Sequence, residues 1–305
     1  MFVVETLAPL ILLIALGAGL AHIKFLGRSF IDDLNKLAFW VVLPALLFST
    51  ASEASVPGDV ALRLFLLLVL ATLLITGLAW VICVLLRVPR EGWGTLLQAA
   101  FRGNLAYIGL PVLAYSLGSD RDSFASAVIV LVLLTVVYNI LAVWVLRGGN
   151  SAGPGMKRML GSILTNPLLI SGLLGLGVSS LGLSLPGFVD RALDSLGGAA
   201  VPLAVLCIGG SLTLTPLRGR RSWILAAALL KVVALPILVF GLARGFGLNP
   251  TESRIVLVLS ACPTAAASYV MVRQMGGDEA LATGAIALST VLSALSLAGA
   301  LAVTV

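Results

Sequence analysis

One apolar stretch of the chain, residues 101–118 (FRGNLAYIGLPVLAYSLG), contains residue types that a membrane-spanning helix rarely carries together. They are a cation, a carboxamide, a phenol and two helix breakers: Arg102, Asn104, Tyr107, Gly109 and Pro111. A carboxamide has donors and an acceptor on one short side chain, and a phenol has a ring and a hydroxyl. Such groups can orient a carboxylate or bridge exposed backbone. The combination predicts a binding site for a small anion.

A second stretch, SACPTAAAS at residues 260–268, supplies Pro263, Thr264 and Ser268. Because proline lacks a backbone donor but suits the first position of a helix, we expect each stretch to form two half-helices. The second halves are predicted to begin at Pro111 and Pro263. Free N–H groups at a half-helix start favour an anion, and free carbonyls at a half-helix end favour a cation. The alternative is a simple proline kink that neighbouring helices stabilise.

Several polar residues have a structural interpretation beside the functional one. Asn104 is predicted to contact the anion, with bracing of the backbone as the alternative. Arg102 either faces the site, as intramembrane charges do by default, or snorkels to the surface. Lys231, at similar depth in another segment, is expected to snorkel or to make a structural contact.

The composition predicts an integral membrane protein. Of 305 residues, 60% are hydrophobic and only 10% are charged, and apolar stretches of about 20 residues recur along the whole chain. The net charge of +6 comes from Lys and Arg dispersed among short loops, which is typical of topology signals rather than of nucleic-acid binding. One histidine, three cysteines within apolar segments and no catalytic motif predict no enzyme, no metal and no cofactor.

Hydropathy, with Gly, Pro and charge as breakers, predicts an all-α fold of ten transmembrane helices: 4–23, 31–51, 60–86, 93–117, 122–146, 159–181, 188–213, 221–245, 252–275 and 279–303. Lys and Arg concentrate in one set of alternate loops, which predicts that both termini face outward.

An internal repeat is predicted from a fixed offset. Phe30 and Phe188, Asp32 and Asp190, and Pro44 and Pro202 each differ by 158 in residue number, and Gly118 and Asp120 match Gly276 and Asp278 at the same offset. Five helices per repeat require the second copy to enter the membrane from the opposite side, so the repeats are inverted. The predicted organisation is residues 1–147 (first repeat), 148–157 (cytoplasmic linker) and 158–305 (second repeat). Pro111 and Pro263 differ by 152, so they fall outside this register.

Several motifs together resemble the auxin efflux carrier family, in its bacterial branch with malate or malonate permease-like proteins. They are FIDDLNKLAFWVVLPALLF, NLAYIGLPVL, TNPLLISGLLGLG, AAVPLAVLCIGGSL and CPTAAASYVMVRQMGGDEALA. The resemblance covers essentially the whole chain. It implies a fold similar to sodium/bile acid symporters, with helices 4 and 9 broken and crossing at the substrate site. Pro111 and Pro263 match the family's crossover prolines, and Asn104 matches its carboxylate-contacting asparagine.

The resemblance also implies a scaffold of helices 1, 2, 6 and 7, a moving transport domain of helices 3–5 and 8–10, and a homodimer. We therefore predict a secondary transporter of a small organic anion in the inner membrane, working by an elevator-like shift. The alternatives are a sodium-coupled symporter, in which the hydroxyls of Ser260 and Thr264 help to hold Na⁺, and a sensor of the same fold that does not transport. The sequence leaves Na⁺ and H⁺ open as coupling ions.

Overall fold

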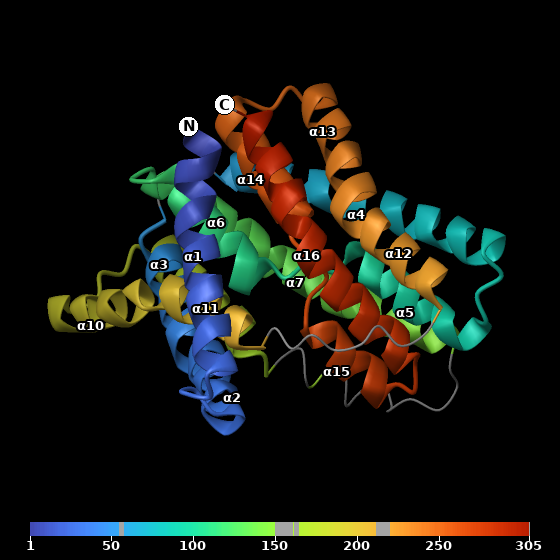
Figure 1. Ribbon diagram of the computed structural model, residues 1–305. Helices are drawn as coiled ribbons and strands as arrows, with labels where there is room; N and C mark the ends of the chain where they lie inside the picture. Colours follow the sequence, from blue (N-terminus) through green and yellow to red (C-terminus); the bar gives the residue numbers. More distant parts are fainter. Residues whose placement is uncertain (55–57, 150–160, 162–164, 212–219, 305) are drawn as a thin grey trace. The chain divides into compact units, whose positions relative to one another are not determined.

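The computed structural model describes residues 1–305 except 55–57, 150–160, 162–164, 212–219 and 305. The described residues form helices joined by short turns, as hydropathy predicted (Figure 1). In the first part of the chain the helices are α1 (Phe2–His22), α2 (Arg28–Leu37), η1 (Ala38–Val42), α3 (Leu43–Ser52), α4 (Gly58–Leu85), α5 (Arg90–Phe101), η2 (Leu105–Gly109), α6 (Leu110–Leu117) and α7 (Arg121–Gly149).

The second part of the chain continues the pattern. Its helices are α9 (Pro167–Ser180), α10 (Gly187–Gly198), α11 (Ala200–Ser211), α12 (Arg221–Leu229), η3 (Leu230–Ala234), α13 (Leu235–Gly245), α14 (Pro250–Ala261), α15 (Ala267–Gln274) and α16 (Glu279–Ala302). The linker predicted at 148–157 lies, from residue 150 onward, outside the described residues.

Within the described residues, seven helices are long and apolar enough to cross a membrane, so the chain is a multi-pass membrane protein. These seven correspond to predicted helices 1, 2, 3, 5, 7, 8 and 10. Predicted helices 4 and 9 are each divided into two shorter pieces, and predicted helix 6 is described from α9 onward. The count of ten spanning helices therefore stays a prediction.

Three prolines within helices each follow a π-helical turn. Pro44, Pro111 and Pro236 each stand two residues after a widened π-helical turn, which is η1, η2 and η3 respectively. A proline ring clashes with the carbonyl four residues earlier, and a π turn at that point gives the ring space. Pro111 therefore stands inside a continuing helix, and it does not begin one.

The chain divides into two compact units. The first unit comprises residues 1–62, 106–133 and 164–214, and small residues allow its helices to approach closely. A Cβ on Gly209 of α11 would collide with the Ile14 carbonyl of α1, and a Cβ on Gly17 of α1 would collide with the Leu206 carbonyl of α11. Close packing through small residues is the usual way in which membrane helices associate, because lipid gives no hydrophobic drive between them.

The second unit comprises residues 63–105, 134–163 and 215–305. Here α16 packs along α12 and against α14, as Figure 1 also shows. Gly94 of α5 faces the backbone of Leu146 in α7, where a Cβ would lie only 2.6 Å from the Leu146 Cα. Both broken segments, at residues 102–104 and 262–266, fall within this unit. The candidate site is therefore built on elements that pack together.

Candidate functional site

The first break interrupts the chain between α5 and η2. Helix α5 ends at Phe101, Arg102 has an extended backbone (φ −76°, ψ 102°), and helical structure resumes at Leu105. The second half therefore begins six residues before Pro111, and the prediction of a start at Pro111 is wrong. Because the π turn η2 accommodates the proline ring, Gly103 and its neighbours make the interruption instead. Gly109 and Pro111 are both buried within the resumed helix.

The second break lies between α14 and α15. Helix α14 ends at Ala261, Cys262 is extended (φ −57°, ψ 144°), and α15 begins at Ala267. Pro263 lies inside the extended segment, four residues before the new helix, so the prediction that it begins that helix is also wrong. The fixed φ of proline is compatible with an extended backbone, so Pro263 fits this segment. Its carbonyl remains free to accept a hydrogen bond.

The two extended segments pair with each other. Gly103 and Thr264 form an isolated antiparallel bridge. The Asn104 N–H donates to the Pro263 carbonyl (2.8 Å), and the Ala265 N–H donates to the Arg102 carbonyl (2.9 Å). The two interrupted backbones thus supply hydrogen-bond partners to each other, which the lipid of a membrane could not do. Gly103 and Thr264 differ by 161 in residue number, which is closer to the predicted repeat offset of 158 than the difference of 152 between Pro111 and Pro263.

Thr264 connects the paired breaks to two neighbouring helices, α16 and α5. Its backbone N–H donates to Ser289 Oγ of α16 (3.0 Å), and its hydroxyl donates to the Ala99 carbonyl in the last turn of α5 (2.8 Å). Thr264 is 1% exposed. Its hydroxyl therefore satisfies one of the carbonyls that a helix end leaves without an intrahelical partner. Thr264 was predicted from the sequence to bind the substrate, and its hydroxyl instead makes a structural contact.

Asn104 remains available for a ligand. It is half-buried at the crossing, and within the described residues its carboxamide has no hydrogen-bond partner. The backbone of Asn104, by contrast, is held by Pro263. The alternative role as a side-chain brace of the backbone therefore has no support in the described contacts. A carboxamide at the edge of a paired break can donate to an oxyanion and accept from a hydroxyl.

Arg102 is buried rather than extended toward the surface. Its guanidinium donates to Asn139 Oδ1 of α7 (2.7 Å) and contacts the Met271 sulfur of α15, and the residue is 8% exposed. The snorkelling alternative is wrong, because these contacts hold the side chain inside the second unit. No carboxylate pairs with Arg102 among the described residues. A buried charge of this kind is a candidate for a functional site, since its burial costs several kcal/mol.

Two more buried polar groups surround these residues. Gln98 of α5 is fully buried, and its Nε2 lies 3.6 Å from the Met271 sulfur while its Oε1 has no partner in the described part of the chain. The Ser268 hydroxyl at the start of α15 is likewise buried without a partner there. Sequence reasoning found Ser268 but missed Gln98 and Asn139. The signal for both was a polar side chain within an otherwise apolar span.

Lys231 and Tyr107, which the sequence analysis singled out, each donate a hydrogen bond to a backbone carbonyl. Lys231 is fully buried in η3, and its Nζ donates to the Ser260 carbonyl (2.6 Å), so it makes a structural contact and does not snorkel. Tyr107 belongs to the first unit, where its hydroxyl donates to the Asn35 carbonyl of α2 (3.3 Å). The predicted contact between Tyr107 and a substrate stays a prediction.

A model of the family described as "Membrane transport protein" matches residues 2–153 and 155–301. The chain belongs to this family. This membership confirms the resemblance to the auxin efflux carriers that the motifs of helices 2, 4, 6, 7 and 9 suggested.

Relatives in the family have similar length. An "Uncharacterized transporter" of Methanothermobacter thermautotrophicus is 26% identical over 96% of this chain and 95% of its own. An uncharacterized transporter of Methanocaldococcus jannaschii is 25% identical over 87% of each chain. A "Putative malonate transporter" of Rhizobium meliloti is 25% identical over 93% of this chain and 92% of its own.

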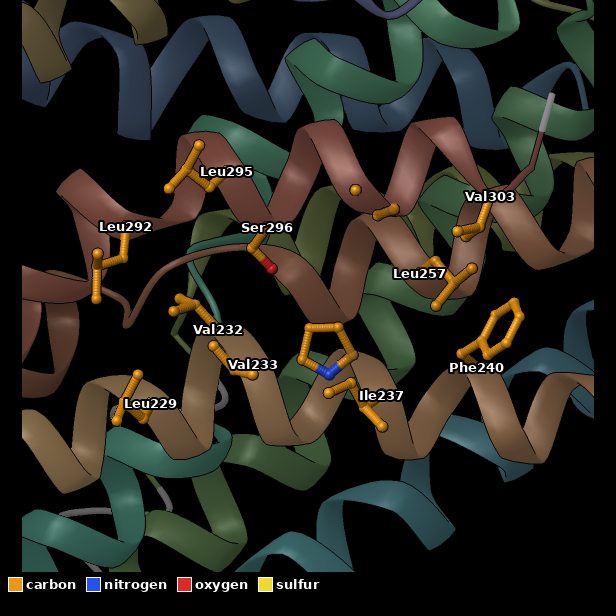
Figure 2. A pocket seen from close by; sticks show the side chains of 13 residues that line it. Leu229, Val232, Val233, Ile237, Phe240, Leu257, Leu292, Leu295, Ser296 and Val303 are labelled. Atoms are coloured by element: carbon orange, nitrogen blue, oxygen red, sulfur yellow. The ribbon is translucent and has the colours of Figure 1, made fainter.

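A separate groove in the second unit has the wrong chemistry for an anion. It has a volume of about 420 Å³ and lies between α16 and the α12–η3–α13 segment, with Leu257 of α14 at its floor (Figure 2). Ser296 is the one hydroxyl-bearing residue in a lining that is otherwise aliphatic or aromatic. Leu295 and Ile237, which line it, are 76% and 65% exposed, so the groove has an open, apolar rim.

Proposed function

We propose that the protein is a secondary transporter of a small organic anion, whose carboxylate binds where the two extended breaks cross. One observation carries the proposal. The first of the paired breaks contains both Arg102, a buried cation that has no carboxylate partner among the described residues, and, two residues later, Asn104, whose carboxamide has no hydrogen-bond partner there. An anion would supply the missing counter-charge. Family membership supports the transport class, and the geometry supports the position.

The proposed roles of the site residues differ. Asn104 and Arg102 contact the carboxylate, and Ser268 and Gln98 offer polar groups that lack a partner in the described part of the chain. Thr264 and Pro263 shape the paired breaks and do not need to touch the substrate, and Gly109 and Pro111 lie in the helix that follows the first break. The Rhizobium relative is named for malonate, which makes short dicarboxylates the first substrates to test.

Alternating access by an elevator-like movement is part of the proposal. The two compact units support it. Predicted helices 1, 2, 6 and 7 belong to the first unit, and the paired breaks, α4 and α12–α16 belong to the second. The units differ from the predicted domains at α6 and the first half of α7, which belong to the first unit. We further propose inverted repeats at 1–147 and 158–305, a homodimer, and an inner-membrane location with both termini outside.

A sodium-coupled symporter is the second candidate. The sequence suggested it because hydroxyl and carbonyl oxygens near the second break could bind Na⁺. In the structure the Thr264 hydroxyl donates to Ala99, the Ser260 hydroxyl donates to Leu257, and the Ser260 carbonyl accepts from Lys231. These contacts favour a carrier that does not bind Na⁺ at the second break. A non-transporting sensor of the same fold remains the third candidate, and it would bind the anion without flux.

The test combines binding and flux. Purified protein is screened by thermal unfolding against mono- and dicarboxylates, and each stabilising compound is then tested for uptake into proteoliposomes. Asn104→Ala should abolish the ligand-induced shift, and Asn104→Asp, which keeps the shape but repels a carboxylate, should do the same. Ser195→Ala on the exposed face of α10 is the control and should keep the shift. An unchanged shift in both Asn104 variants would remove Asn104 from the site. Binding without uptake of any hit would favour the sensor.

A further inference from the structure

Lys231 is a buried cation that the proposed site does not use directly. It lies within the π turn η3, is 0% exposed, and donates from Nζ to the Ser260 carbonyl at 2.6 Å. No carboxylate pairs with it in the described parts of the chain. A lysine without a counter-ion inside a membrane domain is costly to maintain, so its position calls for a functional explanation.

The carbonyl that Lys231 contacts lies at the C-terminal end of α14. Ser260 is the second-last residue of α14, so its carbonyl lies among those that the helix end leaves unpaired and at the negative end of the helix dipole. The break at 262–266 follows directly. In transporters with interrupted helices, unwound carbonyls and half-helix ends of this kind bind the coupling cation.

We propose that Lys231 occupies, as a fixed part of the chain, the place at which the carbonyl end of α14 would otherwise hold a coupling Na⁺. The inference rests on the proposed function in taking the paired breaks as the transport site. An ammonium supplies one positive charge, as Na⁺ does, but it cannot dissociate. The cycle then needs no sodium gradient at this position, and the positive charge stays beside the anion throughout.

The surroundings of Lys231 fit this role. Gly103 of the first break faces the lysine stem, since a Cβ there would be in ordinary van der Waals contact with Lys231 Cε at 3.5 Å. The π turn adds a residue to the helix at this point, which sets the direction of the side chain. The end of α5 has a cation as well, since Arg102 is its C-cap residue. The guanidinium of Arg102 contacts Asn139 and Met271, whereas the Lys231 ammonium donates directly to a carbonyl at the end of α14.

Sodium binding to the full-length purified protein tests the inference without requiring transport. The assay is scintillation proximity with ²²Na⁺, with displacement by unlabelled NaCl and with choline chloride as the ionic-strength control. The wild type should give no displaceable signal. Lys231→Ala should gain one, because it vacates the carbonyl end and leaves space for an ion. Lys36→Ala, at an exposed lysine paired with Asp33, should behave as the wild type does.

Displaceable ²²Na⁺ binding by the wild type would overturn the inference, and this result does not depend on any variant. A folded Lys231→Ala protein without a sodium signal would also overturn it, because the vacated position would then not be a cation site. Loss of folding in Lys231→Ala leaves the wild-type measurement decisive.

Uptake gives an independent readout with malonate as the probe. Wild-type proteoliposomes should take up labelled malonate equally in sodium and in choline buffers. Lys231→Ala should lose about fivefold to a hundredfold of the uptake in choline and recover part of it in sodium, because a buried carbonyl left unpaired costs the equivalent of a change in that range. Stimulation of wild-type uptake by sodium would refute the inference while leaving the proposed function intact. Failure of every carboxylate to bind or move would refute the proposed function, and the ²²Na⁺ result would still stand.

Discussion

Thr264→Val should destabilise the protein by breaking the link between the second break and α5. Valine keeps the branched shape of threonine, so the packing at this 1%-exposed position changes little. The substitution removes one hydroxyl, whose hydrogen bond to the Ala99 carbonyl is 2.8 Å long. That carbonyl belongs to the last turn of α5, where the helix supplies no donor, and in a buried position it would be left unpaired.

The expected cost follows from this geometry. An unpaired buried acceptor costs about 1–3 kcal/mol. At roughly 2–4 °C per kcal/mol, the unfolding temperature should fall by about 2–12 °C. The measurement is thermal unfolding in detergent followed by a thiol-reactive dye, since Cys83, Cys207 and Cys262 are all buried and become accessible on unfolding.

Thr283→Val provides the matched control. The Thr283 hydroxyl donates to the Glu279 carbonyl of its own helix (2.8 Å), and that carbonyl is near the surface at the start of α16. Its loss should shift the unfolding temperature much less. Equal unfolding temperatures for the two variants would refute the reasoning, because the crossing would then not depend on the Thr264 hydroxyl.

Three further variants test other contacts. Arg102→Met, which keeps an unbranched apolar side chain without the charge, should abolish the carboxylate-induced thermal shift, and an unchanged shift would remove Arg102 from the anion site. Ser268→Ala should leave the unfolding temperature unchanged, because its hydroxyl has no partner within the described residues, but it should weaken malonate binding about three- to tenfold by titration calorimetry if the hydroxyl meets the ligand; equal affinity would exclude that contact. Gly209→Val should lower the unfolding temperature more than Gly19→Val, because a Cβ on Gly209 would collide with the Ile14 carbonyl whereas Gly19 has open space; equal effects would argue against close packing of α1 on α11.

Much of the fold could be read from the sequence because its signals are local. Helix α1 and the α12–η3–α13 segment lie within a few residues of the ranges 4–23 and 221–245 that hydropathy predicted. The predicted range 188–213 contains one interruption that hydropathy missed, at Ala199 between α10 and α11. Two adjacent glycines precede Ala199, and glycine weakens a helix without changing the mean hydropathy of a segment.

The candidate site was predictable in its approximate position but not in its contacts. The two interrupted segments were found from their prolines, yet the breaks lie at Gly103 and Thr264. A π turn can absorb a proline, and nothing in the single sequence says whether it does so. Arg102 and Asn104 were singled out by residue type, and both lie at the first break. The sequence left open whether Arg102 snorkels, because that depends on whether a partner such as Asn139 is within reach.

The sequence by itself determined that the chain lies in a membrane, where its apolar segments are, and that two of them are interrupted. Each of these follows from the solvent preference or the backbone geometry of residues that are neighbours in the chain. The tertiary structure decided the partners. Thr264 bonds to Ala99, Arg102 to Asn139, and Lys231 to Ser260, and each pair comes from segments far apart in sequence. A buried polar group must find a partner, but its identity is fixed only when the helices pack.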